Sequence, residues 1–258
     1  MTNLDTAYNY RGFTSHRRLA ATAGDLLDEF TISTKVGFFP GGRGSEHCLD
    51  PVRLRQAVHQ SVQDLKVQPE VVLLHNPERT LAELAPEQGC DRWAAACTAL
   101  DDTTAAGWCR SWGVACWDPR PVLPVLDRAL PAPALLMFRA GLLARSEILD
   151  AGEKLATWFG LGRHARWGMS PYGGQATHPV WSEIDTRQFL QGSQDCSLIQ
   201  AALRVAYELP QVSRMSVSAS TGEHLAELVA ATALDTDDNR IARYRALLRA
   251  KVLTTEAS

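Results

Sequence analysis

Residues 51–75, PVRLRQAVHQSVQDLKVQPEVVLLH, decide the fold class. Apolar residues recur at three- and four-residue spacing through 51–65, which predicts an amphipathic helix. The run EVVLLH at 70–75 has no strict polar–apolar alternation, as expected of a strand covered on both faces. A helix followed directly by a buried strand indicates an α/β protein with parallel strands.

The same alternation extends along most of the chain. Further strands are expected at 3–7, 30–36, 111–117, 133–138, 166–170 and 212–219, and further helices at 121–130 and 198–209. No glycine fingerprint follows the first strand, so a (β/α)8-type TIM barrel is favoured over an open dinucleotide-binding sheet. Seven strands leave one of the eight unaccounted for. We expect a single domain over 1–258, with TTEAS at the end as a frayed tail.

Composition narrows the class of protein. The net charge is -3 and basic residues are scattered, which argues against nucleic acid as a partner. Six cysteines without CxxC pairs fit reduced thiols in the cytoplasm. No apolar run reaches the roughly 18 residues of a membrane span, and the first residues lack the features of a signal peptide. These observations predict a soluble cytoplasmic protein that has no membrane partner.

Four reactive side chains lie at or just after the ends of three successive strands: Asp5, Tyr10, Lys35 and His75. The loops at the carboxyl ends of barrel strands carry the active site. Taken singly, each residue has a plain structural explanation as a turn residue, a surface charge or a core histidine. Their combination in this order favours catalysis. An ammonium beside a tyrosine favours its phenolate, Asp5 can balance Lys35, and His75 can orient a substrate oxygen. The set suits carbonyl reduction, enolisation or elimination.

These segments resemble the aldo-keto reductase family. LDTAYNY (4–10), ISTKVG (32–37) and VVLLHNPE (71–78) resemble its aspartate, lysine and histidine strands, and WGVACW, SPYGGQ and VSASTGEHLAELVAAT resemble its later strand ends. The resemblance covers residues 3 to 233. It implies Asp5, Tyr10, Lys35 and His75 as a catalytic tetrad. Tyr10 would donate a proton to a small-molecule aldehyde or ketone that accepts hydride from NADPH.

The resemblance also implies positions that bind the cofactor, where several of the family's usual residues are replaced. Ala115 and Cys116 stand where the family usually has Ser-Asn, Met137 or a neighbour replaces its glutamine, and Ser218, His224 and Leu228 stand near the adenosine positions. Each lost hydrogen bond could cost about 1 to 3 kcal/mol. Ser220 lies three residues before Glu223, a capping-box spacing that predicts a helix start capped by Ser220, which suits a phosphate or is an ordinary helix start. The cofactor-binding residues implied are Ala115, Cys116, Ser170, Tyr172, Ser218, Ser220, Thr221 and His224.

Three residues are candidates for substrate contact. Arg11 and Arg139 can pair with an anionic substrate, or belong to a solvated face, and Trp117 ends a strand where it can line a pocket. The glycine-rich stretch 38–48 is expected to form a flexible lid. His47 and Cys48 have no partners at metal-ligand spacing, so no metal site is expected.

Family members begin with a hairpin, a strand and a helix that are absent from this chain. A start placed downstream of the true one is the favoured explanation. The alternatives are that another segment or a second subunit fills the gap, which would require self-association, or that the enzyme is a truncated relic.

Three functions therefore stand at the sequence level. The first is an NADPH-dependent carbonyl reductase. The second is a nicotinamide-independent lyase, dehydratase or isomerase that uses the same tetrad. The third, a barrel without catalytic activity, ranks last because it would not need four polar residues at the strand ends.

Overall fold

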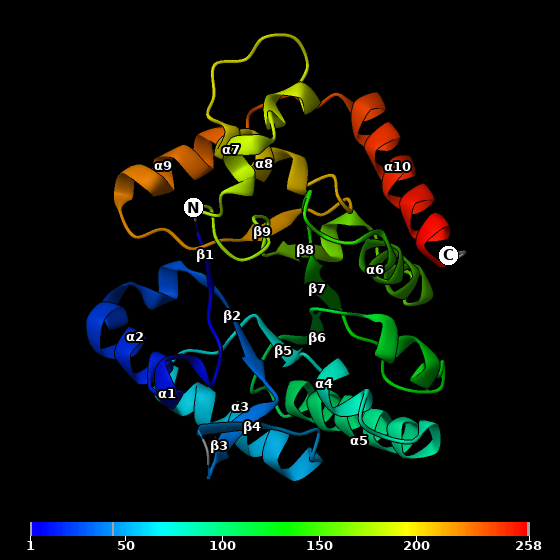
Figure 1. Ribbon diagram of the computed structural model, residues 1–258. Helices are drawn as coiled ribbons and strands as arrows, with labels where there is room; N and C mark the ends of the chain where they lie inside the picture. The colour runs from blue at the N-terminus through cyan, green and yellow to red at the C-terminus, as the bar shows by residue number, and fades with distance from the viewer. Residues whose placement is uncertain (1, 43, 257–258) are drawn as a thin grey trace. The chain divides into compact units, whose positions relative to one another are not determined.

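The computed structural model describes residues 2–42 and 44–256 (Figure 1). The chain forms two compact units, residues 1–137 and 138–258. In Figure 1 the first runs from blue to green and the second from green to red. The division does not test the predicted single domain, which stays a prediction.

The first unit alternates strands with helices. Its elements are β1 (Asn3–Asp5), α1 (Tyr10–Phe13), α2 (Ser15–Ala23), η1 (Gly24–Glu29), β2 (Thr31–Val36), β3 (Phe38–Gly41), β4 (Gly44–His47), α3 (Pro51–Leu65), β5 (Val71–His75), α4 (Glu78–Leu81), α5 (Pro86–Ala105), β6 (Ser111–Cys116) and η2 (Arg120–Val125), with β7 (Leu135–Arg139) reaching the boundary.

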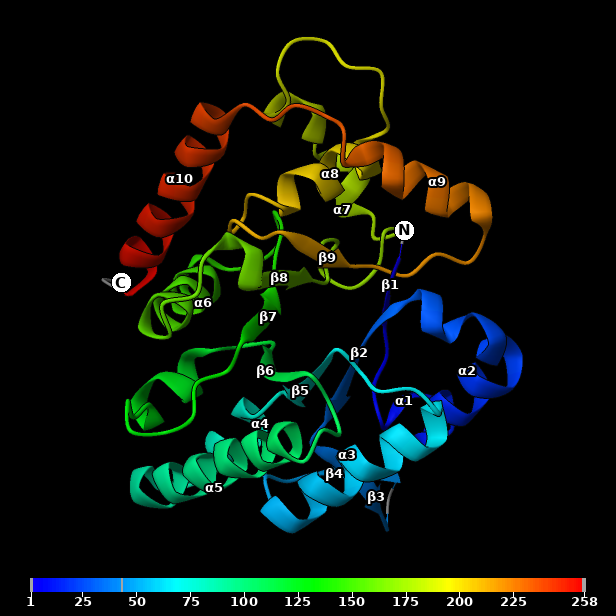
Figure 2. The ribbon, with the colours of Figure 1, turned by 180° about the vertical axis from the view of Figure 1, so that it is seen from behind.

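The strands β1, β2, β5 and β6 lie side by side in chain order and pair in parallel. Parallel neighbours need a crossover, and α3 and α5 supply the long helices between them. These two helices pack against each other, as both Figure 1 and Figure 2 show. Every residue of β5 is buried, which explains why its sequence is apolar throughout up to His75. All the strands' carboxyl ends therefore lie at one edge of this sheet.

Local sequence signals fix the bounds of α3. The Asp50 carboxylate caps the helix by accepting a hydrogen bond from the Arg53 N–H at 2.9 Å, and Pro51 occupies the first turn. Lys66 ends the helix in a left-handed conformation, with φ of 62°. The buried face includes Leu54, Val58 and Leu65. The prediction of a helix over 51–65 is confirmed.

The second unit is mainly helical around a short pair of strands. Its elements are α6 (Ser146–Trp158), η3 (Arg163–Ala165), β8 (Arg166–Met169), α7 (Val180–Glu183), η4 (Thr186–Phe189), α8 (Leu198–Ala206), β9 (Arg214–Ser216), α9 (Gly222–Ala231) and α10 (Asp238–Glu256). The strands β8 and β9 pair in parallel. A buried cluster around Trp181, Phe189 and Leu209 forms the core beside them.

All seven predicted strands are confirmed, whereas three other expectations are corrected. Residues 121–130 form no α-helix and hold only the short 3-10 helix η2 as far as Val125, because Pro124 lacks an N–H and its ring obstructs a continuing helix. The predicted lid at 38–48 contains an antiparallel hairpin of β3 and β4. The predicted tail is helical as far as Glu256; residues 257 and 258 of that tail, and residue 43 of the lid, lie outside the described residues.

No helix in the described chain combines the length and the apolar character that crossing a membrane requires.

Candidate active site

Lys35 and Asp5 form the ion pair at the base of the candidate site. The Lys35 Nζ lies 2.7 Å from Oδ1 and 2.6 Å from Oδ2 of Asp5, and 3.0 Å from the Thr6 carbonyl oxygen. Lys35 is 2% exposed. An ammonium has three donors and no acceptor, so these contacts suit the charged form. Ser33, on the same face of β2, donates to Asp5 at 2.7 Å.

Tyr10 lies above this ion pair. The Lys35 Nζ is 5.3 Å from the centroid of the Tyr10 ring. Tyr10 is 41% exposed, so its ring is open to solvent and to a substrate. The turn after it is irregular, since Arg11 and Gly12 both adopt left-handed backbone conformations. The segment before Tyr10 is fixed by hydrogen bonds from the Tyr8 N–H to the Lys35 carbonyl oxygen at 2.9 Å and from the Tyr10 N–H to the Ala7 carbonyl oxygen at 3.1 Å. The Tyr10 side chain thus lies by the ends of β2 and β5, as its contacts with Lys35 and His75 show.

His75 completes the cluster from the end of β5. Its ring centroid is 6.2 Å from that of Tyr10, with the two planes at 74°. Burial, together with the charge of Lys35, lowers the pKa of His75 to about 3. The imidazole is therefore neutral near pH 7 and acts there as a hydrogen-bonding group rather than a cation. The structure thus brings together all four residues of the predicted tetrad.

The first residue of α4, Glu78, places a buried carboxyl group just after the end of β6, which the sequence analysis missed. The Glu78 Oε1 accepts hydrogen bonds from the N–H groups of Trp117 at 2.8 Å and Asp118 at 3.4 Å. Burial raises the pKa of Glu78 to about 7. Ala115 and Cys116 are fully buried, and burial raises the pKa of the Cys116 thiol well above its ordinary value. Their side chains offer no exposed polar group at this strand end.

Ser170 and Tyr172 follow β8 in the second unit. Ser170 has a positive φ of 57°. The Ser170 Oγ and the Tyr172 hydroxyl are buried polar atoms that have no hydrogen-bond partner within the described chain. Buried polar atoms in folded proteins almost always have a hydrogen-bond partner. This strand end is therefore suited to binding a polar ligand.

The start of α9 carries the other predicted cofactor residues. Thr221 is the N-cap, because its side chain accepts a hydrogen bond from the His224 N–H at 3.2 Å. The expectation that Ser220 caps the helix is therefore wrong; Ser220 instead contacts the His224 ring at 3.3 Å. Ser218, Ser220, Thr221 and His224 are all exposed. The first turn of this ten-residue helix has backbone N–H groups without partners inside the helix, and these can donate hydrogen bonds to an anion.

The predicted substrate residues lie in different parts of the chain. Arg11 is exposed in the turn after Tyr10, and Trp117 is 41% exposed just after β6. Arg139 ends β7 and is half-buried. Within the described residues, no three His, Cys, Asp or Glu side chains are grouped as metal ligands would be.

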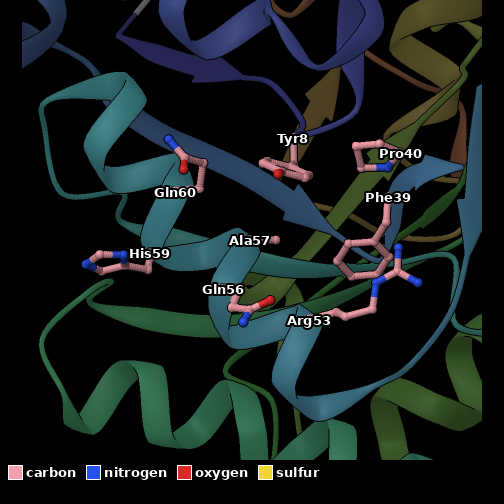
Figure 3. A pocket seen from close by; sticks show the side chains of 8 residues that line it. All are labelled: Tyr8, Phe39, Pro40, Arg53, Gln56, Ala57, His59 and Gln60. Atoms are coloured by element: carbon pink, nitrogen blue, oxygen red, sulfur yellow. The ribbon is translucent and has the colours of Figure 1, made fainter.

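The first unit also has a pocket whose lining includes none of the tetrad residues. Figure 3 shows its eight lining side chains, from the hairpin, α3 and the turn after β1: Tyr8, Phe39, Pro40, Arg53, Gln56, Ala57, His59 and Gln60. Its volume is about 450 Å³. Tyr8 lines this pocket, whereas Tyr10, two residues later, lies against Lys35. The two tyrosine side chains therefore belong to different sites.

Comparisons with known proteins agree with this geometry. The model of the Aldo/keto reductase family matches residues 1–139, which include the whole tetrad. None of the curated proteins matches this chain.

Several solved structures share the fold. An aldo-keto reductase from Bacillus halodurans in its holo form superimposes with a TM-score of 0.69 at 17% identity, over 96% of this chain and 82% of that one. An aldo-keto reductase from Klebsiella pneumoniae in complex with NADPH gives 0.68 at 17%, over 96% and 80%. The aldose reductase of Schistosoma japonicum gives 0.61 at 16%, over 95% and 78%. The fold is therefore of the (β/α)8 type, as predicted.

Proposed function

This chain belongs to the aldo/keto reductase family, and we propose that it reduces an aldehyde or ketone to an alcohol with NADPH, Tyr10 serving as proton donor. The observation that carries the proposal is the Lys35 ammonium, fixed by Asp5 and 5.3 Å from the Tyr10 ring. A family of oxidoreductases and a neighbour bound to NADPH support the same chemistry.

The proton step follows from the positions of the side chains. Tyr10 is exposed, so a carbonyl oxygen can approach its hydroxyl. When the hydroxyl gives up its proton to that oxygen, a phenolate remains, and the nearby Lys35 charge stabilises it. Asp5 keeps Lys35 in place. A bound NADPH would supply the hydride for the carbonyl carbon and be oxidised to NADP⁺, so that hydride and the Tyr10 proton together account for the alcohol.

His75 contributes as a neutral imidazole. Its lowered pKa keeps it uncharged at neutral pH, so it does not compete with Lys35 for an anion. Its ring lies beside Tyr10, where it can orient the substrate oxygen by a hydrogen bond. Arg11 and Trp117, both exposed, and Arg139 are proposed contacts for a substrate that carries a negative charge.

Some residues fit a nicotinamide nucleotide and others do not. The buried polar atoms of Ser170 and Tyr172 are suited to a bound group, and the N-terminus of α9 suits a phosphate. Ala115 and Cys116 do not fit the role of the family's Ser-Asn, because neither side chain is accessible. We therefore assign the cofactor to Ser170, Tyr172, Ser218, Ser220, Thr221 and His224.

Six free thiols support the proposal that the enzyme works in the cytoplasm.

The test combines binding with turnover. NADPH is titrated into the protein while tryptophan fluorescence is followed, and NADPH consumption is then measured with a panel of neutral and anionic aldehydes and ketones. Saturable binding and consumption that depends on the carbonyl compound are expected. Absence of both in the folded protein would overturn the proposal.

The buried Ala115 and Cys116 favour one alternative, a lyase, dehydratase or isomerase that uses the tetrad without nicotinamide. Such an enzyme would convert a hydroxy or carbonyl compound with no consumption of NADPH. The same panel, analysed for products in the absence of NADPH, separates the two functions.

A further inference from the structure

The hairpin of β3 and β4 lies directly against His75. Phe38 and His47 are paired residues in the hairpin's register. The Phe38 ring contacts the His47 ring at 4.8 Å and the His75 ring at 4.9 Å between centroids, with planes at 71° and 73°. Phe38 is therefore held between two imidazoles, one from the hairpin and one from the tetrad.

His47 also binds the backbone of His75. Its Nε2 lies 2.8 Å from the His75 carbonyl oxygen, and its Nδ1 lies 2.7 Å from the Thr80 hydroxyl. Because a carbonyl only accepts, Nε2 carries the hydrogen; in the neutral ring Nδ1 then accepts from Thr80. Burial lowers the pKa of His47, which favours this neutral form. One side chain thus links the hairpin to the end of β5 and to α4.

Gly37 lets the hairpin approach this closely. Its φ is +142°, and a Cβ there would lie 2.9 Å from the His75 carbonyl oxygen and 3.3 Å from the His47 Nε2. Any larger residue would push the hairpin away from β5. The sequence Gly37-Phe38 therefore places backbone and ring together against His75.

The His75 ring has little else to orient it. Its Nδ1 is buried and has no hydrogen-bond partner within the described chain. Its orientation therefore depends on packing, which the edges of Phe38 and Tyr10 supply. The charged or titratable groups acting on it are Lys35, His47 and Arg79; those acting on His47 include Arg79 and Glu83.

We propose that His47 is a positioning residue, which fixes the His75 backbone and, through Phe38, the orientation of the His75 ring toward the substrate oxygen. The expected effect on catalysis rests on the proposed function. The expected effect on the His75 ring is independent of it, because that ring can be observed without turnover.

The decisive variants are His47→Phe, which keeps a ring against Phe38 but loses both hydrogen bonds, and His47→Gln, which keeps a donor for the His75 carbonyl. Thr80→Val removes only the partner of Nδ1 and keeps the side-chain shape. His59→Phe is the matched control, since His59 is exposed and its ring packs on Trp108 at 4.9 Å without a role in the tetrad. Circular dichroism confirms that each variant is folded.

His47→Phe is expected to lower kcat on the order of tenfold to a hundredfold with little change in KM, and His47→Gln to recover most of the loss. In nuclear magnetic resonance titrations the pKa of His75 is expected to rise from about 3 toward its ordinary value in His47→Phe, because the nearby His47 charge is lost and water reaches the loosened ring. Thr80→Val keeps the His47 charge and so isolates the effect of loosening. Thr80→Val should give a smaller change in the same direction, and His59→Phe none.

Two results would overturn the proposal. One is an unchanged His75 titration in both His47→Phe and Thr80→Val; the other is a lowered kcat in His47→Gln equal to that in His47→Phe. If His47→Phe does not fold, an unchanged His75 titration in Thr80→Val, or a kcat of His47→Gln far below that of the wild type, overturns the proposal. If the wild-type protein reduces no carbonyl compound, the proposed function fails, and the titration of His75 still decides whether His47 positions it.

Discussion

Lys35 is the residue on which the candidate site depends, because its ammonium is almost fully buried while its partner Asp5 has a side chain 21% exposed. Removal of one partner of such a pair leaves a charge without compensation. Lys35→Met is expected to lower the free energy of unfolding by about 3 kcal/mol, measured by urea denaturation. In the double variant Asp5→Asn/Lys35→Met the loss should be smaller than in Lys35→Met. Equal stability of Lys35→Met and wild type would contradict the ion pair.

Glu78 gives the site a pH-dependent stability of predictable sign. Its folded pKa of about 7 lies above the ordinary value of 4.5, so the folded state holds a proton that the unfolded state releases between these values. The contribution of Glu78 to the free energy of unfolding is therefore fully present below pH 4.5 and is lost as the pH rises to 7. The loss amounts to about 3 kcal/mol at most. Glu78→Gln should be more stable than wild type at pH 8, with the difference vanishing near pH 4.5, as measured by urea denaturation.

Two histidines, His16 and His75, change the stability with pH in the opposite direction, so their effect has to be distinguished from that of Glu78. Burial lowers the folded pKa of His16 to about 4 and that of His75 to about 3, both from 6.5. Their stabilising contribution is present above pH 6.5 and is lost as pH falls through those lower values. The comparison of Glu78→Gln with wild type cancels both histidines. A pH-independent difference between the two proteins would show that Glu78 is ionised in the folded state.

At the scale of elements, the sequence predicts what has a local cause. The helix over 51–65 has a capping aspartate, an amphipathic pattern and a clear end, and its bounds agree with α3. The segment 121–130 has the same apolar spacing, but Pro124 prevents the helix, so periodicity alone misleads there. The hairpin at 38–47 was missed because its glycines and polar residues lack the alternation of a strand.

The site was predictable to the same degree. The proximity of the tetrad residues was predictable because Asp5 and His75 end strands, Lys35 is the last residue but one of β2, and parallel strands end at one edge. Ser33 could have been found from its place two residues before Lys35, on the same face of β2. The roles of His47 and Glu78 could not, because each depends on contact with a segment distant in sequence: His75 for one, Trp117 for the other.

The helix α10 is held by an arginine that is largely buried. Arg245 donates to both oxygens of Glu153, at 2.9 and 2.8 Å, and to Asp150 at 2.5 Å, all on α6. Arg245→Met leaves two carboxylates near each other without this cation, so it should lower the free energy of unfolding by about 2 to 3 kcal/mol. Hydrogen exchange in α10 should quicken.

Arg249 provides the matched control for this prediction. It also pairs with Asp150, at 2.7 Å, but its side chain is 52% exposed. A pair this exposed contributes less than about 1 kcal/mol, so Arg249→Met should change the exchange of α10 only slightly. Equal effects of the two variants would show that burial of Arg245 does not determine how α10 docks.

For the whole molecule, the predicted single domain requires the two compact units to unfold together. Residues 1–137 and 138–258 each have buried apolar residues. A single cooperative transition is expected in calorimetry, with equal calorimetric and van't Hoff enthalpies. The same transition should appear in tryptophan fluorescence, because the tryptophans lie in both units. Two separate transitions would mean two domains.

The fold of the whole chain matches aldo-keto reductases at 16% to 18% identity. The same fold can form with so few identical residues because the pattern of buried strands and amphipathic helices specifies the architecture. The proposed tetrad is a smaller set still, and its four residues all lie within residues 1–137. A fold match alone does not establish the reaction, which leaves hydride transfer as the claim to measure.

The most direct measurement follows deuterium from NADPD, labelled at the transferable position, into the product of a carbonyl compound that the enzyme accepts. We predict one deuterium on the former carbonyl carbon of the alcohol. In Tyr10→Phe the same product should form on the order of a hundredfold to ten-thousandfold more slowly, while NADPD affinity stays unchanged. Turnover without deuterium in the product, or at an undiminished rate in Tyr10→Phe, would contradict the account.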